Sequence, residues 1–420
     1  MSKVTAFRNK GLLNAVVMFA IFAVSPQVTA SAFAVKEQSV THLGNAFAGT
    51  ASSATDASTA FYNPAGLVEL KHSQAVVSAT YVMAKLKLHN ASARNTINQA
   101  VVGNNFAKPK SRALIPGLFL SWRLDDSFTL GFSVSAPFGL LTKYTNTDIT
   151  RYVATESKIT TVMYSPTIGY KLNDQFSVGA GFDAMRVKAT LAGDVFLGAN
   201  EGYLINRAHG WAYGYHLGIL YKPSYITKMG LTYFSKFDVR AKGLANASNF
   251  TSSPSTLITR VNLPDRLVYS VTHQYTDEWT AMGEIEWTHW SRLKSLRLDY
   301  NTGNPVTEYF FYKNSYRVSL GADYKYSQAL TMKGGLAYDQ SPIINAYRSA
   351  RVPDSNRYWL AFGLKYMVNK NISIDGAYAH LFAKNAVIAQ RAAAPSQAAL
   401  NGNYKNSADI VGVQLTWNFV

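Results

Sequence analysis

The chain has 420 residues, of which 48% are hydrophobic and 13% aromatic, and its formal net charge is +17. Only 15% of the residues are Asp, Glu, Lys or Arg, and this low charge with many aromatic residues excludes a disordered chain. Cys is absent, which excludes disulfides and thiolate metal sites, and no long apolar run follows the N-terminus, which excludes a helical membrane protein. A large soluble β protein and a transmembrane β-barrel remain.

The first 30 residues have the three parts of a secretory signal peptide. Three basic residues, an apolar stretch over residues 11–24 and the small-residue cleavage site Val28-Thr29-Ala30 follow one another, with Ala32-Phe33-Ala34 as a second candidate site. The apolar stretch is too short for a membrane anchor. We therefore expect residues 1–30 to be removed from a secreted protein.

Residues 31–72 differ in composition from everything after them. Small and turn-forming residues such as Gly44, Gly49 and Ser52 dominate, and apolar residues show little alternation with period two. From about residue 74 the alternation is clear, as in residues 411–419, where apolar side chains occupy every odd position. Alternation with period two is typical of strands with one apolar face. We therefore predict a short N-terminal unit over residues 31–72 and a β domain over residues 73–420.

The connections between the predicted strands separate a barrel from a soluble sandwich. Short turns, for example at residues 173–174 and 327–328, alternate with long polar connections, for example at residues 190–210 and 241–257. Outer-membrane barrels have short turns on the periplasmic side, long loops outside and an even number of strands. The sequence therefore predicts an all-β protein, a transmembrane antiparallel β-barrel of about 14 strands in the outer membrane of a Gram-negative bacterium.

Several segments resemble the FadL/TodX family of outer-membrane transporters. Residues 43–49 (LGNAFAG) and 63–66 (NPAG) are similar to the N-terminal hatch of that family, and residues 136–140 (APFGL) match a segment at the end of its third strand. The resemblance implies a barrel with the hatch, residues 31–72, inside the lumen. It further implies capture of long-chain fatty acids or other hydrophobic molecules by extracellular loops, an apolar lumen site, hatch movement and passive lateral exit through a kink in the third strand.

The hatch candidates are Asn63, Pro64 and Ala65. Proline fixes its own φ and removes a backbone donor, and an asparagine side chain can hold a turn through hydrogen bonds to nearby backbone. The family pattern around them favours a functional plug, although an ordinary turn has the same chemistry.

The candidates for a lateral opening are Ala136, Pro137 and Gly139. Pro137 follows an alternating strand over residues 128–136, where a proline cannot donate to the ladder and marks an edge, a bulge or an end. Two interpretations stay open: a break that opens the barrel wall, and a simple end of the strand at the outer rim.

Five residues are candidates for ligand binding. The resemblance places Phe33, near the start of the processed chain, in the lumen site, although a loose terminal aromatic residue is the plain alternative. Phe138 and Leu140 come from the segment at the end of the third strand, and Arg186 and Lys188 are placed near the upper lumen as partners for a carboxylate.

We expect a passive transporter of long-chain fatty acids or similar hydrophobic molecules, and not an enzyme, because no His forms a nucleophile motif with a nearby Ser. No cofactor, metal or nucleic acid is expected. The expected partners are outer-membrane lipid, lipopolysaccharide and the barrel-assembly machinery, and we expect a monomer. The alternatives are an aromatic-hydrocarbon transporter and a surface adhesin or phage receptor that uses the barrel as a scaffold; the predicted hatch argues against a third, a general porin.

Overall fold

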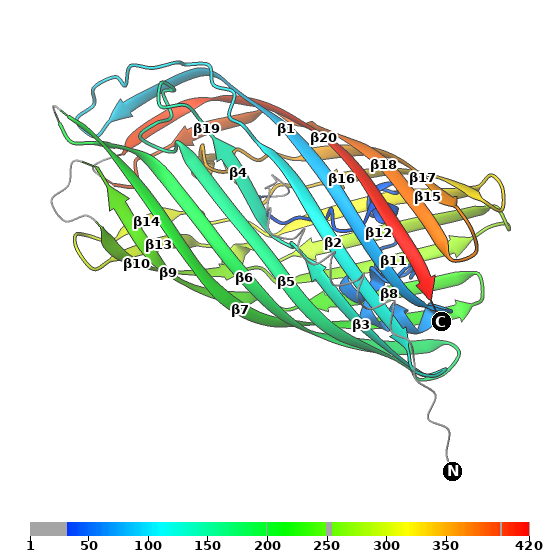
Figure 1. Ribbon diagram of the computed structural model, residues 1–420. Coiled ribbons are helices and arrows are strands. Elements are labelled where there is room, and N and C mark those ends of the chain that lie inside the picture. Colours follow the sequence, from blue (N-terminus) through cyan, green and yellow to red (C-terminus); the bar gives the residue numbers. More distant parts are fainter. Residues whose placement is uncertain (1–31, 199, 249–253, 395–396, 420) are drawn as a thin grey trace, which may run out of the picture.

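The computed structural model describes residues 32–198, 200–248, 254–394 and 397–419 (Figure 1). The predicted signal peptide, residues 1–30, lies outside these ranges, as does residue 31. Among the described residues, no helix is both long and apolar enough to cross a membrane.

The described residues contain 20 β-strands, which belong to one sheet. Their bounds are β1 (Ser73–Asn95), β2 (Arg112–Arg123), β3 (Phe128–Ser135), β4 (Gly139–Lys143), β5 (Glu156–Lys171), β6 (Phe176–Phe196), β7 (Glu201–Ser224), β8 (Thr227–Phe234), β9 (Phe237–Ala247), β10 (Ser255–Leu263), β11 (Arg266–Gln274), β12 (Trp279–Thr288), β13 (Ser295–Tyr300), β14 (Val306–Tyr309), β15 (Ser315–Lys325), β16 (Leu330–Asp339), β17 (Arg357–Met367), β18 (Ile372–Ala383), β19 (Ala386–Gln390) and β20 (Ala398–Phe419).

The sheet closes into an antiparallel barrel because β1 pairs with β20 over almost its whole length, from Ser73 opposite Phe419 to Asn95 opposite Ala398. In the described part of the chain the strands make 14 passes along the barrel wall. Eight passes are single strands, and six consist of two strands separated by a short break: β3 and β4, β8 and β9, β10 and β11, β12 and β13, β14 and β15, β18 and β19. The predicted fold class is confirmed.

Alternation along each strand decides which side chains face outward. In β17, Tyr358, Leu360 and Phe362 are exposed, whereas Trp359 and Ala361, which lie between them, are buried. Exposed apolar side chains on a closed barrel form the surface that faces lipid. The residues of the opposite face, such as Trp359 and Ala361, enclose the lumen.

The N-terminal segment lies inside the barrel, where Figure 1 shows it in blue near the end at which β20 finishes. It contains two short helices, α2 (Val40–Leu43) and α3 (Thr59–Tyr62), and the 3-10 helix η2 (Pro64–Glu69). Two further 3-10 helices, η3 (Trp290–Arg292) and η4 (Asn345–Tyr347), belong to connections between strands. The predicted hatch inside the lumen is confirmed.

Polar contacts fix the hatch to opposite parts of the wall. Lys36 Nζ lies 3.2 Å from a carboxylate oxygen of Glu284 in β12, and the backbone N–H of Thr50 donates to the same carboxylate at 2.7 Å. On β20, Gln414 donates to Asp56 at 2.9 Å. All five side chains are buried, so these bonds satisfy polar groups that would otherwise cost stability.

Candidate functional site

An apolar cavity lies inside the barrel wall, beside the N-terminal end of the hatch. It encloses about 870 Å³ of space not occupied by atoms, part of which is open to solvent. Its lining is almost wholly aliphatic and aromatic and comes from the hatch, the wall strands and the connections between them, and includes Phe33, Phe138, Leu140, Val187, Val239 and Leu293.

Phe33 extends the hatch into this cavity. Its side chain is buried, with 6% of its surface exposed, and its ring centroid lies 6.1 Å from that of Phe138 and 5.0 Å from that of Trp290. The structure therefore brings Phe33, Phe138 and Leu140 together on one apolar surface, as three of the candidate ligand residues require.

Arg186 and Lys188 do not belong to this cavity. Both are exposed, whereas Val187 between them is buried and lines the cavity. Successive side chains of a strand point to opposite faces, so these two residues must face outward when Val187 faces inward. The guanidinium of Arg186 lies 5.9 Å from the centre of the outward-facing Trp211 ring. The prediction that Arg186 and Lys188 meet a carboxylate in the lumen is wrong, because their side chains lie on the outer face of β6.

Arg351 and Glu308 provide charge in the cavity instead. Arg351 Nε lies 3.0 Å from Glu308 Oε1, and both side chains are about nine-tenths buried. Arg351 Nη1 also donates to Ser157 Oγ at 3.0 Å. Sequence reasoning missed Arg351, which directly precedes another lining residue of the cavity, Val352.

Ala136, Pro137 and Phe138 interrupt the third pass of the barrel. β3 ends at Ser135 and β4 resumes at Gly139, so Pro137 lies at a break within the pass and not at its end. Thr161 of β5 spans the break, because its hydroxyl group donates to Phe138 O at 2.6 Å and accepts from Phe138 N at 3.1 Å.

The N-terminal segment pairs with the free edge of this break. Val35 N donates to Pro137 O at 2.8 Å, and Gly139 N donates to Phe33 O at 2.9 Å. The Gln38 side chain adds two bonds to the backbone of Ala136, donating to its carbonyl and accepting from its N–H, both at 2.9 Å. The hatch thus takes the position of a neighbouring strand where the wall strand is missing.

The opposite side of the break is the upper part of β2. Residues Leu118–Arg123 pair with β3, but among the described residues no ladder joins Arg112–Gly117 to β4. Phe138 and Leu140, which line the apolar cavity, lie at this interruption. The cavity therefore borders the place where the wall lacks strand pairing.

Asn63, Pro64 and Ala65 dock on the wall formed by β5, β6 and β7. The Asn63 side chain donates to Ala51 O at 2.6 Å and to Ile219 O of β7 at 3.1 Å, and it accepts from Ala65 N at 3.1 Å. Gly218 makes this approach possible, because a Cβ on it would lie 1.9 Å from Asn63 Oδ1. The turn is an attachment of the hatch to the barrel.

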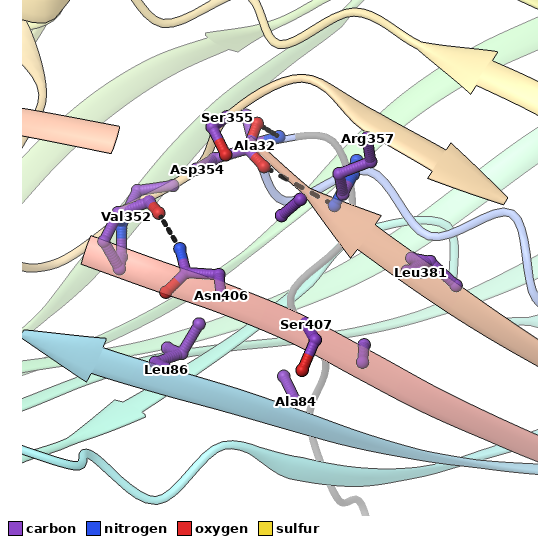
Figure 2. Close-up of a pocket in the computed structure, with 13 residues that line it drawn as sticks. Ala32, Ala84, Leu86, Val352, Asp354, Ser355, Arg357, Leu381, Asn406 and Ser407 are labelled. Atoms are coloured by element: carbon purple, nitrogen blue, oxygen red, sulfur yellow. Dashed lines mark hydrogen bonds and ion pairs between the residues drawn. The ribbon is translucent and has the colours of Figure 1, made fainter. Parts of the chain in front are cut away.

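A second cavity lies where the described chain begins, between β1, β18, β20 and the connection before β17 (Figure 2). Ala32 N donates to Asp354 Oδ2 at 3.0 Å, and Arg357 lies 3.5 Å from the same carboxylate group. Asn406 holds the connection by donating to Pro353 O at 2.7 Å. The start of the hatch is therefore held by the segment that also supplies Val352 to the apolar cavity.

Comparison with known sequences agrees with this architecture. The family described as "Outer membrane protein transport protein (OMPP1/FadL/TodX)" matches residues 21–419. The chain belongs to this family. Its OMPP1/FadL/TodX relatives include outer membrane protein P1 of Haemophilus influenzae, with 26% identity over 93% of this chain and 95% of the relative. The long-chain fatty acid transport protein of Escherichia coli K12 is 25% identical over 92% of this chain and 95% of its own length.

Solved structures of the OMPP1/FadL/TodX family share the fold. A FadL homologue of Pseudomonas aeruginosa superposes with a TM-score of 0.87 at 23% identity, covering 92% of this chain and all of the other. The toluene transporter TodX of Pseudomonas putida gives a TM-score of 0.71 at 21% identity, covering 93% of this chain and all of the other. The chain is thus an outer-membrane transport protein of a Gram-negative bacterium.

Proposed function

We propose that this protein carries long-chain fatty acids across the outer membrane by passive diffusion, and that it acts by binding and release and not as an enzyme. The observation that carries the proposal is an apolar lumen cavity with one buried arginine in its lining. Relatives that cover nearly the whole chain are named long-chain fatty acid transport proteins, which supports the same substrate class.

The cavity chemistry suits an amphipathic acid. Burying each methylene of an acyl chain contributes about 0.8 kcal/mol, so a long chain gains affinity from the aliphatic and aromatic lining. The carboxylate group would compete with Glu308 for the Arg351 guanidinium, which presents donors in a fork that fits a carboxylate. This exchange keeps the buried arginine paired before and after the ligand arrives.

Release follows from the break in the third pass. Phe33 and Phe138 line the cavity, and the N-terminal segment is hydrogen-bonded to the break. If residues 33–38 move away from Pro137 and Gly139, the wall loses its substitute strand and the cavity opens between β2 and β4 toward lipid. Ala136, Pro137 and Gly139 then act as a lateral opening. Asn63, Pro64 and Ala65 keep the rest of the hatch attached.

An aromatic-hydrocarbon substrate is the second candidate, since a toluene transporter shares the fold and Phe33, Phe138 and Phe310 line the cavity. A hydrocarbon has no group for Arg351 to bind, so the two candidates differ at this residue. In either case we infer a monomer folded by the barrel-assembly machinery, since β1 pairs with β20 and closes the barrel within one chain.

Arg351→Gln tests the substrate class. We expect oleate to bind about 10-fold more weakly, the loss that follows from one charge-assisted hydrogen bond, whereas methyl oleate and toluene bind as before. Titration with a fluorescent fatty acid and competition by these three compounds measure both effects. Lys188→Gln, which removes an outward-facing charge, is the matched control and leaves all affinities unchanged.

Arg351→Gln leaves Glu308 without its partner, so the double variant Arg351→Gln/Glu308→Gln is measured beside it. Equal loss of oleate binding in both variants assigns the effect to the arginine. Unchanged oleate affinity in the double variant would contradict a carboxylate ligand. Toluene binding that exceeds oleate binding in the unmodified protein would favour the hydrocarbon candidate.

A further inference from the structure

Six exposed basic side chains form a group on the outer surface of the barrel. They lie on four neighbouring strands and are defined here as the outer basic cluster: Arg186, Lys188, His209, Arg240, Lys242 and Arg260. Their strand neighbours Val187, Ala241 and Val261 face the lumen cavity, so the cluster lies on the other side of the same wall. It is therefore separate from the ligand site.

Strand pairing sets these basic side chains directly opposite one another. Arg240 of β9 is the partner of Arg260 of β10, and His209 of β7 is the partner of both Lys188 of β6 and Lys242 of β9. Cβ atoms of directly opposed residues are about 5 Å apart, and like charges at that distance destabilise a sheet. The arrangement favours an anion that bridges the strands.

Acidic side chains of the protein do not neutralise the cluster. In the part of the chain that the structure describes, none of its six side chains forms an ion pair or a side-chain hydrogen bond. The nearest acid along β9, Asp238, is 2.8 Å from Lys236, and Asp299 of β13 is bonded to Arg297 at 2.6 Å. The charge of the cluster is therefore free for an external ligand.

The cluster lies at the height of one membrane surface. Arg186 follows Phe176, at the short-turn end of β6, by ten residues, or about 25 Å along the axis of a barrel with strands tilted by about 40°. That distance is the height of the apolar band of an outer-membrane barrel, about 25 Å. Between the two levels the wall is apolar, with Phe182 53% exposed and Leu217 47% exposed. The cluster thus stands above a surface that faces acyl chains.

The opposite wall has a different surface. Along β15, β16 and β17 the outward-facing residues are apolar or aromatic, as at Val318, Leu336 and Tyr358. A smaller exposed basic pair, Lys87 and Lys405, lies where β1 and β20 pair, and the cluster on β6, β7, β9 and β10 differs from it in its number of charges. A local basic group at the membrane surface, with apolar wall below it, matches an anionic lipid with several acyl chains.

We infer that the outer basic cluster binds the phosphate groups of lipopolysaccharide in the outer leaflet, while the acyl chains of its lipid A pack on the wall below. Lipid A carries two phosphates, one on each sugar of its disaccharide. The cluster offers two separate sets of donors, the Arg240 and Arg260 pair and the row formed by Lys188, His209 and Lys242. Arginine binds phosphate through two parallel hydrogen bonds, which suits the directly opposed pair.

The test compares two double variants of the full protein in detergent micelles. Arg240→Gln/Arg260→Gln removes two charges from the cluster, and Lys325→Gln/Lys370→Gln removes two exposed charges near the short turns at the other end of the barrel. Native mass spectrometry is used to titrate both with diphosphorylated lipid A. We expect about 10-fold weaker binding for the cluster variant only, and similarly weak binding of dephosphorylated lipid A to the unmodified protein.

Folding and alternative anions are controlled in the same series. Arg240→Lys/Arg260→Lys keeps the charges and retains most of the binding, and the heat-dependent shift of each variant on a gel shows that its barrel is folded. Equal lipid A affinity in both Gln variants would overturn the inference, as would equal affinity for dephosphorylated lipid A. Displacement of lipid A by an equal concentration of inorganic phosphate would indicate a site for soluble anions and overturn it too.

Discussion

The contact between Gly218 and Asn63 shows at the scale of one residue how the hatch is attached. Gly218→Ala would place a methyl group 1.9 Å from Asn63 Oδ1, so the turn at Asn63 must move away from β7. We expect backbone amides of residues 60–66 to exchange hydrogen at least 10-fold faster, since the displaced side chain loses bonds worth about 1 kcal/mol each. Hydrogen exchange followed by mass spectrometry measures this.

Gly334→Ala is the matched control for that experiment, because a Cβ on Gly334 meets nothing within 4 Å. It leaves exchange of residues 60–66 as in the unmodified protein. If both alanine variants behave alike, the close approach at Gly218 does not hold the hatch.

Phe33 provides a second test at this scale. Phe33→Ala removes a ring that contacts Phe138 and Trp290 in the cavity, and we expect the affinity for oleate to fall about 10-fold with the lost apolar contact. Phe182→Ala removes an exposed ring from the outer wall and leaves the affinity unchanged. Titration with a labelled fatty acid compares the two, and equal affinities would remove Phe33 from the binding site.

The structure places some of the residues predicted from the sequence in the cavity and others outside it, for a physical reason. Phe33, Phe138 and Leu140 were predicted by resemblance, which transfers positions along the chain and does not depend on strand register. Arg186 and Lys188 were chosen by residue type, and type alone does not tell which face of a strand a side chain occupies. Arg351 lies in a connection between strands, where no alternation of apolar and polar residues shows which way a side chain points. Its burial follows only from tertiary packing.

At the scale of the element, the hatch contains a histidine, His42, that is buried in the folded protein. Burial lowers the pKa of His42 to about 4 from its ordinary value near 6.5, and its ring packs against Tyr62 at 5.0 Å. Because the pKa is lower in the folded state, the stabilisation is complete above pH 6.5 and is lost as the pH falls toward 4. The hatch should therefore loosen on acidification within that window.

His42→Phe keeps a ring against Tyr62 and removes the titration. Hydrogen exchange of residues 39–47 should quicken between pH 6.5 and 4 in the unmodified protein, after correction for the intrinsic rate, and stay nearly constant in the variant. An identical pH dependence in both proteins would assign the loosening to other groups.

The break in the third pass could be predicted from the sequence only in part. Pro137 indicated that strand pairing fails, and the structure places a break there with the strand resuming at Gly139. The sequence could not show that residues 33–38 fill the free edge, because that pairing joins segments about 100 residues apart and depends on the closed wall around them.

At the scale of the whole molecule, the alternation of short turns and long connections predicted a barrel of about 14 strands, and the described chain makes 14 passes. That prediction succeeded because closure is a property of strand number and connection pattern, both of which are visible in the sequence. The proposed exit of the substrate also involves the whole molecule: we propose that substrate leaves through the wall when the hatch moves away from the break in the third pass.

An engineered crosslink tests this claim directly. Ala34 and Phe138 form an antiparallel bridge flanked by the bonds from Val35 to Pro137 and from Gly139 to Phe33, which makes them a non-hydrogen-bonded pair. Side chains of such pairs are close enough for a disulfide. Because the chain has no Cys, Ala34→Cys/Phe138→Cys introduces one defined bond that oxidation closes and dithiothreitol opens.

The decisive measurement is fatty-acid uptake by cells that carry this double variant, in the oxidised and the reduced state. We expect oxidation to stop uptake and reduction to restore it, while the oxidised and the reduced variant bind oleate in detergent with equal affinity. Equal uptake in both states, with the crosslink confirmed by mass spectrometry, would contradict exit through the break.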